Sequence, residues 1–297
     1  MAVRLGEDDV LGWAAYAPAR EEVRSAQRGD ALPPPTPSMP VGTIATSTRS
    51  VVDALLELGE LEQVRLGEQP SFTPVAAANR HVIDDPFAFL LAVIFDQGIV
   101  AERAWRAPYD LKQRLGHLDP ATMAAQSAAV RVAINQQPRL HRFVERVPEW
   151  VVEAARIVVE QYAGDASRIW ADQPSAAVLR RRLDAFPGSG QKKAAMAVEI
   201  LERDLGVEVV EMRGSDIAYD VHVRRVFLGT GLAEQDYLDH MVDVARRAHP
   251  GRPGAIDAPA WTVGRRWCHA GLPDCPGCAL AQICPKLVGR AAGVTGA

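Results

Sequence analysis

The chain has 297 residues, of which 48% are hydrophobic, 24% charged and 6% aromatic, a composition typical of one or two soluble globular domains. Its net charge of −4 argues against a uniformly basic nucleic-acid binder, and no apolar run reaches the length of a membrane span. Because the N-terminal residues also lack the apolar core of a signal peptide, we expect a cytoplasmic protein without a membrane partner. We also expect the protein to be a monomer.

The first 45 residues end in a proline-rich stretch, GDALPPPTPSMPVG, which predicts an extended linker after an N-terminal segment of unassigned function. The following TSTRSVVDALLELGELEQ has a Ser/Thr cap and apolar residues at helical spacing, so a helix is expected near residues 45 to 62. Helical spacing continues from DDPFAFLLAVIF onward, and VEVVEM is the one short, ambiguous strand candidate. The pattern predicts an all-α fold.

A helical hairpin is predicted in LRRRLDAFPGSGQKKAAMAVEIL, where two helices flank a tight turn. Gly188 and Gly190 permit positive φ, and the unpaired N–H groups of the second helix could then bind an anion such as a DNA phosphate. Basic residues surround the turn: Arg180, Arg181, Arg182, Lys192 and Lys193. An ordinary turn between two packed helices remains the alternative interpretation.

A carboxylate follows in YDVHVRRVF, where Asp220 stands immediately before an apolar-periodic segment. That position is typical of a helix N-cap. An ionised carboxylate there could also orient a water molecule or stabilise a developing cation.

All the cysteines lie near the C-terminus with the spacing C-x6-C-x2-C-x5-C, at Cys268, Cys275, Cys278 and Cys284. In a reducing compartment, clustered cysteines more often bind metal than form disulfides. The spacing fits neither the paired knuckles of a zinc ribbon nor a bacterial ferredoxin, although four thiolates also suit zinc. Arg265, Arg266 and Lys286 make the surrounding segment basic.

In this order, FPGSGQKKA, YDVHV and the four cysteines resemble the endonuclease III superfamily of helix-hairpin-helix DNA glycosylases, over about residues 84 to 286. The resemblance implies two helical domains: a six-helix barrel at 85–205, and a cluster domain formed by 46–84 plus 206–297. It also implies double-stranded DNA as the partner, with a damaged or mismatched base flipped into the cleft between the domains and cut from its sugar. The expected location is then the cytoplasm, in association with the nucleoid.

The resemblance also assigns residues. Lys192 takes the place of the lysine that attacks the sugar C1′ and supports AP lyase activity, and Asp220 that of the aspartate that assists it. Gln97, beside Asp96, falls where the family fills or borders the gap left by the flipped base. The remaining DNA contacts are assigned to Gly188, Gly190, Gln191, Lys193, Arg265, Arg266 and Lys286. The cysteines would hold a [4Fe–4S] cluster as a structural clamp.

Some features depart from the family pattern. The segment between Lys192 and Asp220 is longer than expected, so Asp216 is an alternative acid, and a shifted register could exchange Lys192 with Lys193. A monofunctional glycosylase that uses Asp220 and water, a catalytically silent DNA-binding protein and an electron-transfer protein remain alternatives. The excised base cannot be inferred from the sequence.

Overall fold

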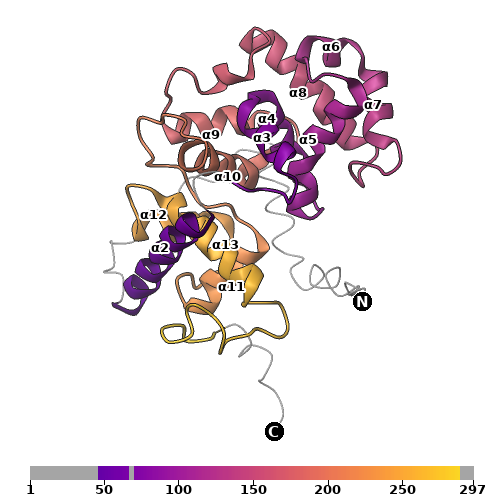
Figure 1. Ribbon diagram of the computed structural model, residues 1–297. Helices are drawn as coiled ribbons and strands as arrows, with labels where there is room; N and C mark the ends of the chain where they lie inside the picture. Colours follow the sequence, from indigo (N-terminus) through magenta and orange to yellow (C-terminus); the bar gives the residue numbers. More distant parts are fainter. Residues whose placement is uncertain (1–45, 67–69, 288–297) are drawn as a thin grey trace. The chain divides into compact units, whose positions relative to one another are not determined.

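The computed structural model describes residues 46–66 and 70–287, and within these ranges it contains helices but no strand (Figure 1). The predicted all-α class is therefore confirmed. No helix in the described part of the chain combines the length and apolar character that a membrane span needs. The N-terminal segment and linker predicted for residues 1–45 lie outside the described residues.

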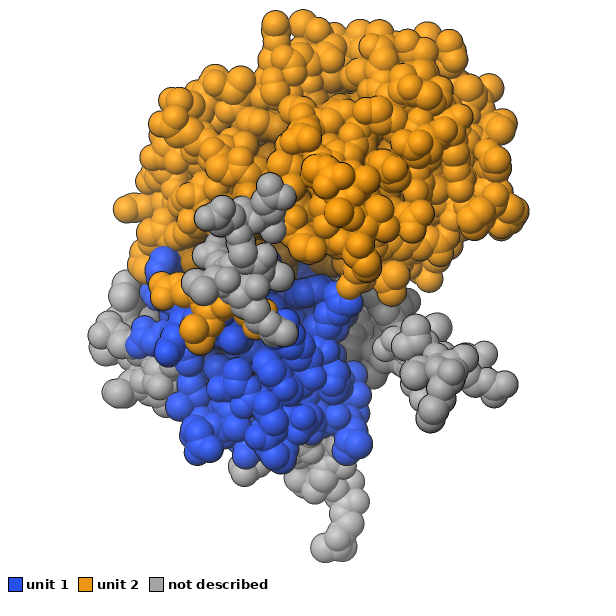
Figure 2. Space-filling model, in the orientation of Figure 1, with its two compact units in different colours: residues 1–58, 219–249, 256–297 blue, residues 59–218, 250–255 orange. Residues whose placement is uncertain are grey.

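The chain divides into two compact units (Figure 2). Of the described residues, 59–66, 70–218 and 250–255 form the larger unit, and 46–58, 219–249 and 256–287 form the smaller unit. This division differs from the expected one, because 59–84 and 206–218 group with the larger unit. Residues 59–84 group with the larger unit because α3 (Ala76–Asp84) packs on α4 (Pro86–Phe95) and α5 (Ala101–Leu115).

The larger unit is built around α4, in which every residue from Phe87 to Phe95 is buried. The helix begins cleanly because Pro86 occupies its first position and one Asp85 oxygen accepts hydrogen bonds from the N–H groups of Phe87 and Ala88. A helix that is apolar on all sides needs neighbours on all sides. α4 accordingly contacts α3, α5, α8 (Arg146–Tyr162) and α10 (Gly190–Arg203).

The remaining helices of this unit complete its core. α6 (Pro120–Ala125) and α7 (Ser127–Asn135) pack on α8. The 3-10 helix η3 (Ala166–Ile169) contacts α4, and α9 (Ala176–Asp184) packs on α10.

The long segment between α10 and α11 is irregular, so the strand considered for VEVVEM does not form. Val207 and Val209 are partly buried against the core of the larger unit. The carbonyl of Glu211 accepts a hydrogen bond of 2.8 Å from the N–H of Ala176, the first residue of α9. The extra residues therefore cover apolar surface and satisfy one of the unpaired N–H groups at the start of α9.

The smaller unit contains α11 (Val221–Thr230), α12 (Leu238–Ala248) and α13 (Asp257–Arg266), together with the part of α2 (Thr46–Leu66) up to Leu58. The 3-10 helix η4 (Pro253–Ile256) leads into α13. α11 and α13 pack closely, and Gly264 lies at their contact. A Cβ at Gly264 would come within 2.8 Å of the His222 carbonyl oxygen, so only glycine allows this approach.

Candidate functional site

The predicted hairpin is present as α9, a tight turn and α10. Gly188 and Gly190 have φ of +75° and +73°, as expected for a turn that needs left-handed backbone. Their surroundings differ, because a Cβ at Gly188 would lie 2.4 Å from Cε3 of Trp150, whereas nothing lies within 4 Å of one at Gly190. Gly188 is thus packed on α8, and Gly190 leaves room for an approaching group.

The start of α10 lacks a side-chain cap. Ser189 is its N-cap residue but makes no capping hydrogen bond, and its hydroxyl, in a residue only 7% exposed, has no hydrogen-bond partner in the part of the chain that the structure describes. The first N–H groups of a helix carry partial positive charge and can receive an anion. The turn can therefore bind a phosphate.

The two lysines after the turn have different surroundings. Lys192 is half-buried in the first turn of α10, whereas Lys193 is only 2% exposed. The Lys193 Nζ donates a hydrogen bond of 2.9 Å to the Ile94 carbonyl and lies 5.9 Å from the centre of a Trp150 ring. Burial, reinforced by the charge of Lys192 and opposed by that of Asp96, lowers the pKa of Lys193 to about 7.

Two residues assigned to DNA contact are therefore used inside the larger unit. Lys193 binds the end of α4, and the Gln191 side chain donates a hydrogen bond of 2.7 Å to the Ile217 carbonyl. Because the Lys193 amine is buried in its hydrogen bond to the Ile94 carbonyl, the structure argues against an exchange with Lys192 as the nucleophile, and the assignment of Lys193 to DNA contact stays a prediction.

The arginines before the turn are mostly engaged in ion pairs. Arg182 forms a two-pronged pair with Asp172, at 2.6 and 2.7 Å, and Arg180 lies 3.4 Å from the buried Asp216. Asp216, the alternative catalytic acid, is thus held in an ion pair within the larger unit. Arg181 is exposed on α9.

Gln97 follows α4 in an exposed turn. Its carbonyl lies 3.0 Å from Nε2 of His141, a fully buried residue that carried no recognisable signal in the sequence. Burial lowers the pKa of His141 to about 4, opposed by the bond to Gln97 and assisted by the charges of Lys193, Arg103 and Arg142. His141 is therefore neutral at physiological pH.

Asp220 belongs to the smaller unit and is the N-cap of α11, as predicted. One of its oxygens accepts hydrogen bonds of 2.8 and 3.0 Å from the N–H groups of His222 and Val223. The residue is 8% exposed. These bonds fix the orientation of the carboxylate.

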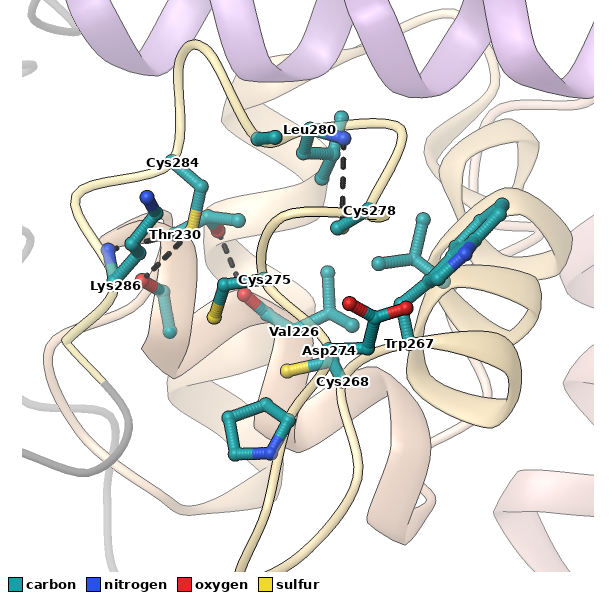
Figure 3. A pocket seen from close by; sticks show the side chains of 14 residues that line it. Val226, Thr230, Trp267, Cys268, Asp274, Cys275, Cys278, Leu280, Cys284 and Lys286 are labelled. Atoms are coloured by element: carbon teal, nitrogen blue, oxygen red, sulfur yellow. Dashed lines mark hydrogen bonds between the residues drawn. The ribbon is translucent and has the colours of Figure 1, made fainter.

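The four cysteines line one pocket at the end of the chain's described part (Figure 3), together with Val226, Gly229, Thr230, Val263, Trp267, Pro273, Asp274, Leu280, Ala281 and Lys286. Backbone N–H groups of Leu280 and Lys286 donate to the sulfurs of Cys278 and Cys284, both at 3.4 Å. The Arg225 side chain fixes the loop by donating to the Cys268 carbonyl.

The chemistry of this donor set favours a bound metal group. Burial raises the pKa of the Cys268 and Cys278 thiols, and the neighbouring cysteines add to the rise. Four thiolates can ionise side by side only when a bound cation offsets this penalty. Within the described residues, however, no three His, Cys, Asp or Glu side chains are close enough to hold a single metal ion.

The basic residues beside the cysteines are exposed. Arg265 and Arg266 lie at the end of α13, with guanidinium groups 5.0 and 5.9 Å from the ring centres of Trp261 and Trp267. Lys286 follows the last cysteine and has φ of +58°. The smaller unit thus carries Asp220, the cysteines and these basic residues, whereas the larger unit carries the hairpin and Gln97.

Comparisons with known proteins identify the fold. Neither protein-family models nor curated protein sequences give a match. Among solved structures, a trapped covalent intermediate of endonuclease III with DNA and a non-covalent endonuclease III–DNA complex each match with a TM-score of 0.59 and 17% identity. Each match covers 84% of this chain and all of the other. A thermostable thymine-DNA glycosylase matches with a TM-score of 0.56 and 15% identity, over 81% of this chain and 96% of the other.

Proposed function

We propose, from the endonuclease III fold and the residues that this chain places on it, that the protein is a DNA glycosylase of base-excision repair. The observation that carries the proposal is the hairpin. Its turn leaves the N-terminal end of α10 uncapped by Ser189 and open at Gly190, and Lys192 lies within the first turn of the helix. A phosphate bound there would bring the deoxyribose of a flipped nucleotide near an amine.

In the proposed reaction, the unprotonated amine of Lys192 attacks the sugar C1′ while the glycosidic C1′–N bond breaks, and the base leaves with the electron pair of that bond. The sugar ring then opens at its C1′–O4′ bond, with O4′ taking up a proton, and this leaves a Schiff base between the amine and C1′. Elimination from that adduct can then cleave the strand. The Asp220 carboxylate would stabilise the positive charge that develops on the sugar. Its orientation by two N–H groups supports this role, because a preorganised charge needs no rearrangement during the reaction.

We further propose that Cys268, Cys275, Cys278 and Cys284 hold a [4Fe–4S] cluster, to which each cysteine supplies one thiolate. Two features support this: the cysteines line one pocket, and two of their sulfurs accept N–H hydrogen bonds. The group would fix the loop between the basic residues of α13 and Lys286. Iron and sulfide analysis of the purified protein tests the assignment, and zinc without iron would refute it.

The glycosylase proposal is tested by incubating the protein with duplexes that carry a panel of damaged and mismatched bases, with borohydride added to trap a Schiff base. We expect base release on at least one duplex and a covalent protein–DNA adduct. Lys192→Ala should abolish the adduct, whereas Lys112→Ala, which removes a half-buried lysine on α5, should retain it.

The outcomes separate the parts of the proposal. Base release without an adduct would leave a monofunctional glycosylase and reject the role of Lys192. An adduct that persists in Lys192→Ala would assign the attack to another amine. No base release from any duplex would reject the enzyme in favour of a protein that only binds DNA.

A further inference from the structure

The turn after α4 is held from two sides by residues remote in sequence. α4 ends at Phe95, and the N–H of Gln97 donates a hydrogen bond of 2.7 Å back to the Phe95 carbonyl. Gly98 then adopts φ of +65°, and a Cβ there would lie 2.9 Å from Nη2 of Arg142. The Gln97 side chain is exposed, so the turn presents it to solvent on a fixed backbone.

His141 provides the first contact, and its ring has a defined tautomer. Its Nδ1 accepts a hydrogen bond of 3.0 Å from the N–H of Phe143, so this nitrogen carries no proton. Nε2 is then the protonated nitrogen, and it donates to the Gln97 carbonyl at 3.0 Å. A second proton on the ring would sit on Nδ1 and point at the Phe143 N–H, which is itself a donor. The two hydrogen bonds of His141 therefore require its neutral form.

Lys193 provides the second contact, from the hairpin. Its amine reaches the Ile94 carbonyl, three residues before Gln97. Because Lys193 follows Lys192 directly in α10, one helical turn carries both the proposed nucleophile and the residue that binds the end of α4.

A purely structural role explains these contacts poorly. The last carbonyls of a helix need partners, but water or a local turn can supply them at the surface. Burying an amine and an imidazole for this purpose is expensive, and an apolar side chain of similar size would stabilise the core more. Polar groups retained in a core therefore indicate that a particular geometry is required.

We propose that Lys193 and His141 are positioning residues that hold Gln97 in one orientation relative to the hairpin, ready to enter the gap left by a flipped base. The inference rests on the proposed function and deepens it. It links the residue proposed to fill the gap to the helix that carries the proposed nucleophile, through side chains that are buried in the larger unit.

Two measurements test the proposal. The first is hydrogen exchange of peptides spanning residues 94 to 100 in the protein without DNA. The second is the preference for a gapped duplex, in which a tetrahydrofuran abasic analogue replaces one nucleotide and leaves a gap where its base would be. The preference is the affinity for this duplex divided by the affinity for the same duplex with the base present. The variants are His141→Leu and Lys193→Met, which remove the donors, and His141→Gln, whose amide can still donate to the Gln97 carbonyl.

In His141→Leu and Lys193→Met we expect faster exchange across residues 94 to 100. The preference for the gapped duplex should fall about tenfold, because a small displacement of a positioned group weakens the interactions that depend on it. His141→Gln should retain most of the preference. Adding Gln97→Ala to His141→Leu should cause no further loss, because His141 acts through Gln97.

Asn79→Leu is the matched control, because Asn79 also holds a turn of the larger unit by accepting hydrogen bonds of 3.2 and 2.9 Å from the N–H groups of Phe72 and Thr73. It should change exchange near Phe72 and leave the preference intact. Unchanged exchange in both test variants would overturn the proposed contacts. A preference equal to that of the parent, or losses that multiply in the double variant, would overturn the positioning role.

The result for the parent protein separates this proposal from the one on which it rests. If the parent shows neither a preference for the gapped duplex nor base release, the glycosylase function fails and the DNA role of Gln97 fails with it. If the parent shows both and the variants do not differ from it, the function stands and the positioning role alone is rejected.

Discussion

At the scale of single residues, Lys193 contributes to how the stability of the larger unit depends on pH. Its pKa is about 7 in the folded protein, against 10.5 for a lysine side chain in water, so between these limits the unfolded chain binds more protons. The contribution of Lys193 to the free energy of unfolding is therefore highest above pH 10.5. It falls as the pH drops from 10.5 to about 7, and it stays constant below pH 7. One pKa unit corresponds to about 1.4 kcal/mol, so the whole difference corresponds to about 5 kcal/mol.

Lys193→Met should flatten this dependence. At pH 7 we expect the variant to be more stable than the parent, with a free energy of unfolding about 2 kcal/mol higher. Removing a poorly solvated cation stabilises the folded state, and leaving the Ile94 carbonyl unpaired offsets part of this gain. Above pH 10 the parent should be the more stable protein. Urea unfolding across this pH range measures both, with Lys112→Met as the control, and parallel curves for parent and variant would contradict the prediction.

The two glycines of the hairpin should respond differently to a single methyl group. Both have positive φ, so alanine introduces left-handed strain of about 1 kcal/mol at either position. At Gly188 the methyl would also overlap the Trp150 ring. We expect Gly188→Ala to lower the free energy of unfolding by about 3 kcal/mol and Gly190→Ala by about 1 kcal/mol.

Gly190→Ala should nevertheless weaken binding to duplex DNA, because its methyl would occupy the open space beside the start of α10. Thermal unfolding and a DNA-binding titration at low salt check the two effects. Equal destabilisation by both substitutions would show that Trp150 does not pack on Gly188 as described.

At the scale of elements, the cap of α11 allows two roles of Asp220 to be separated. Asparagine and aspartate cap helices about equally well, so Asp220→Asn should keep stability within a few tenths of a kcal/mol, whereas Asp220→Ala should lose about 1 kcal/mol. Only the carboxylate can stabilise a developing cation, so both variants should lose base release. A fully active Asp220→Asn protein with normal stability would restrict Asp220 to capping.

Local patterns in the sequence were sufficient to predict the helices and the hairpin. The apolar run that became α4, the Gly188 and Gly190 turn and the cap at Asp220 all depend on neighbours within a few residues. VEVVEM could not be decided in this way, because its valines cover an existing core instead of pairing with another strand.

The burial of Lys193 depends on which face of α10 meets α4. A signal was present, because Lys193 precedes the buried Ala197 and Ile200 by four and seven residues, the spacing of one helical face. A basic side chain on an apolar stripe is usually assigned to the surface, and this hid the contact. His141 gave no comparable signal, because its partner lies on a turn distant in sequence.

At the scale of the whole molecule, residues 250–255 belong to the larger unit, although the segments before and after them in the sequence belong to the smaller unit. Arg252 forms ion pairs there with Glu199, at 2.9 Å, and with Glu202. The Gly254 N–H donates a hydrogen bond of 3.0 Å to the Ser215 hydroxyl. The Glu199 side chain is only 4% exposed, so its ion pair with Arg252 is largely shielded from water.

Arg252→Met should lower the free energy of unfolding by about 3 kcal/mol, since it leaves a buried carboxylate without its partner. Glu199→Gln in the same protein should restore much of the loss by removing that charge. Arg247→Met, which breaks an exposed pair with Asp243, should change stability by less than about 1 kcal/mol. Urea unfolding compares the four proteins, and a double variant no more stable than Arg252→Met would contradict the explanation.

The discontinuity of the smaller unit also sets an order of events during synthesis. Val51, Val52 and Leu55 of α2 are buried in the finished protein, yet the helices grouped with them begin only after Tyr219. About 160 residues must be translated in between, which takes roughly 8 to 30 seconds at elongation rates of about 5 to 20 residues per second. Residues 59–218, which make up most of the larger unit, are therefore complete before the helices grouped with α2 are made, and α2 must wait with its apolar face uncovered until those helices emerge.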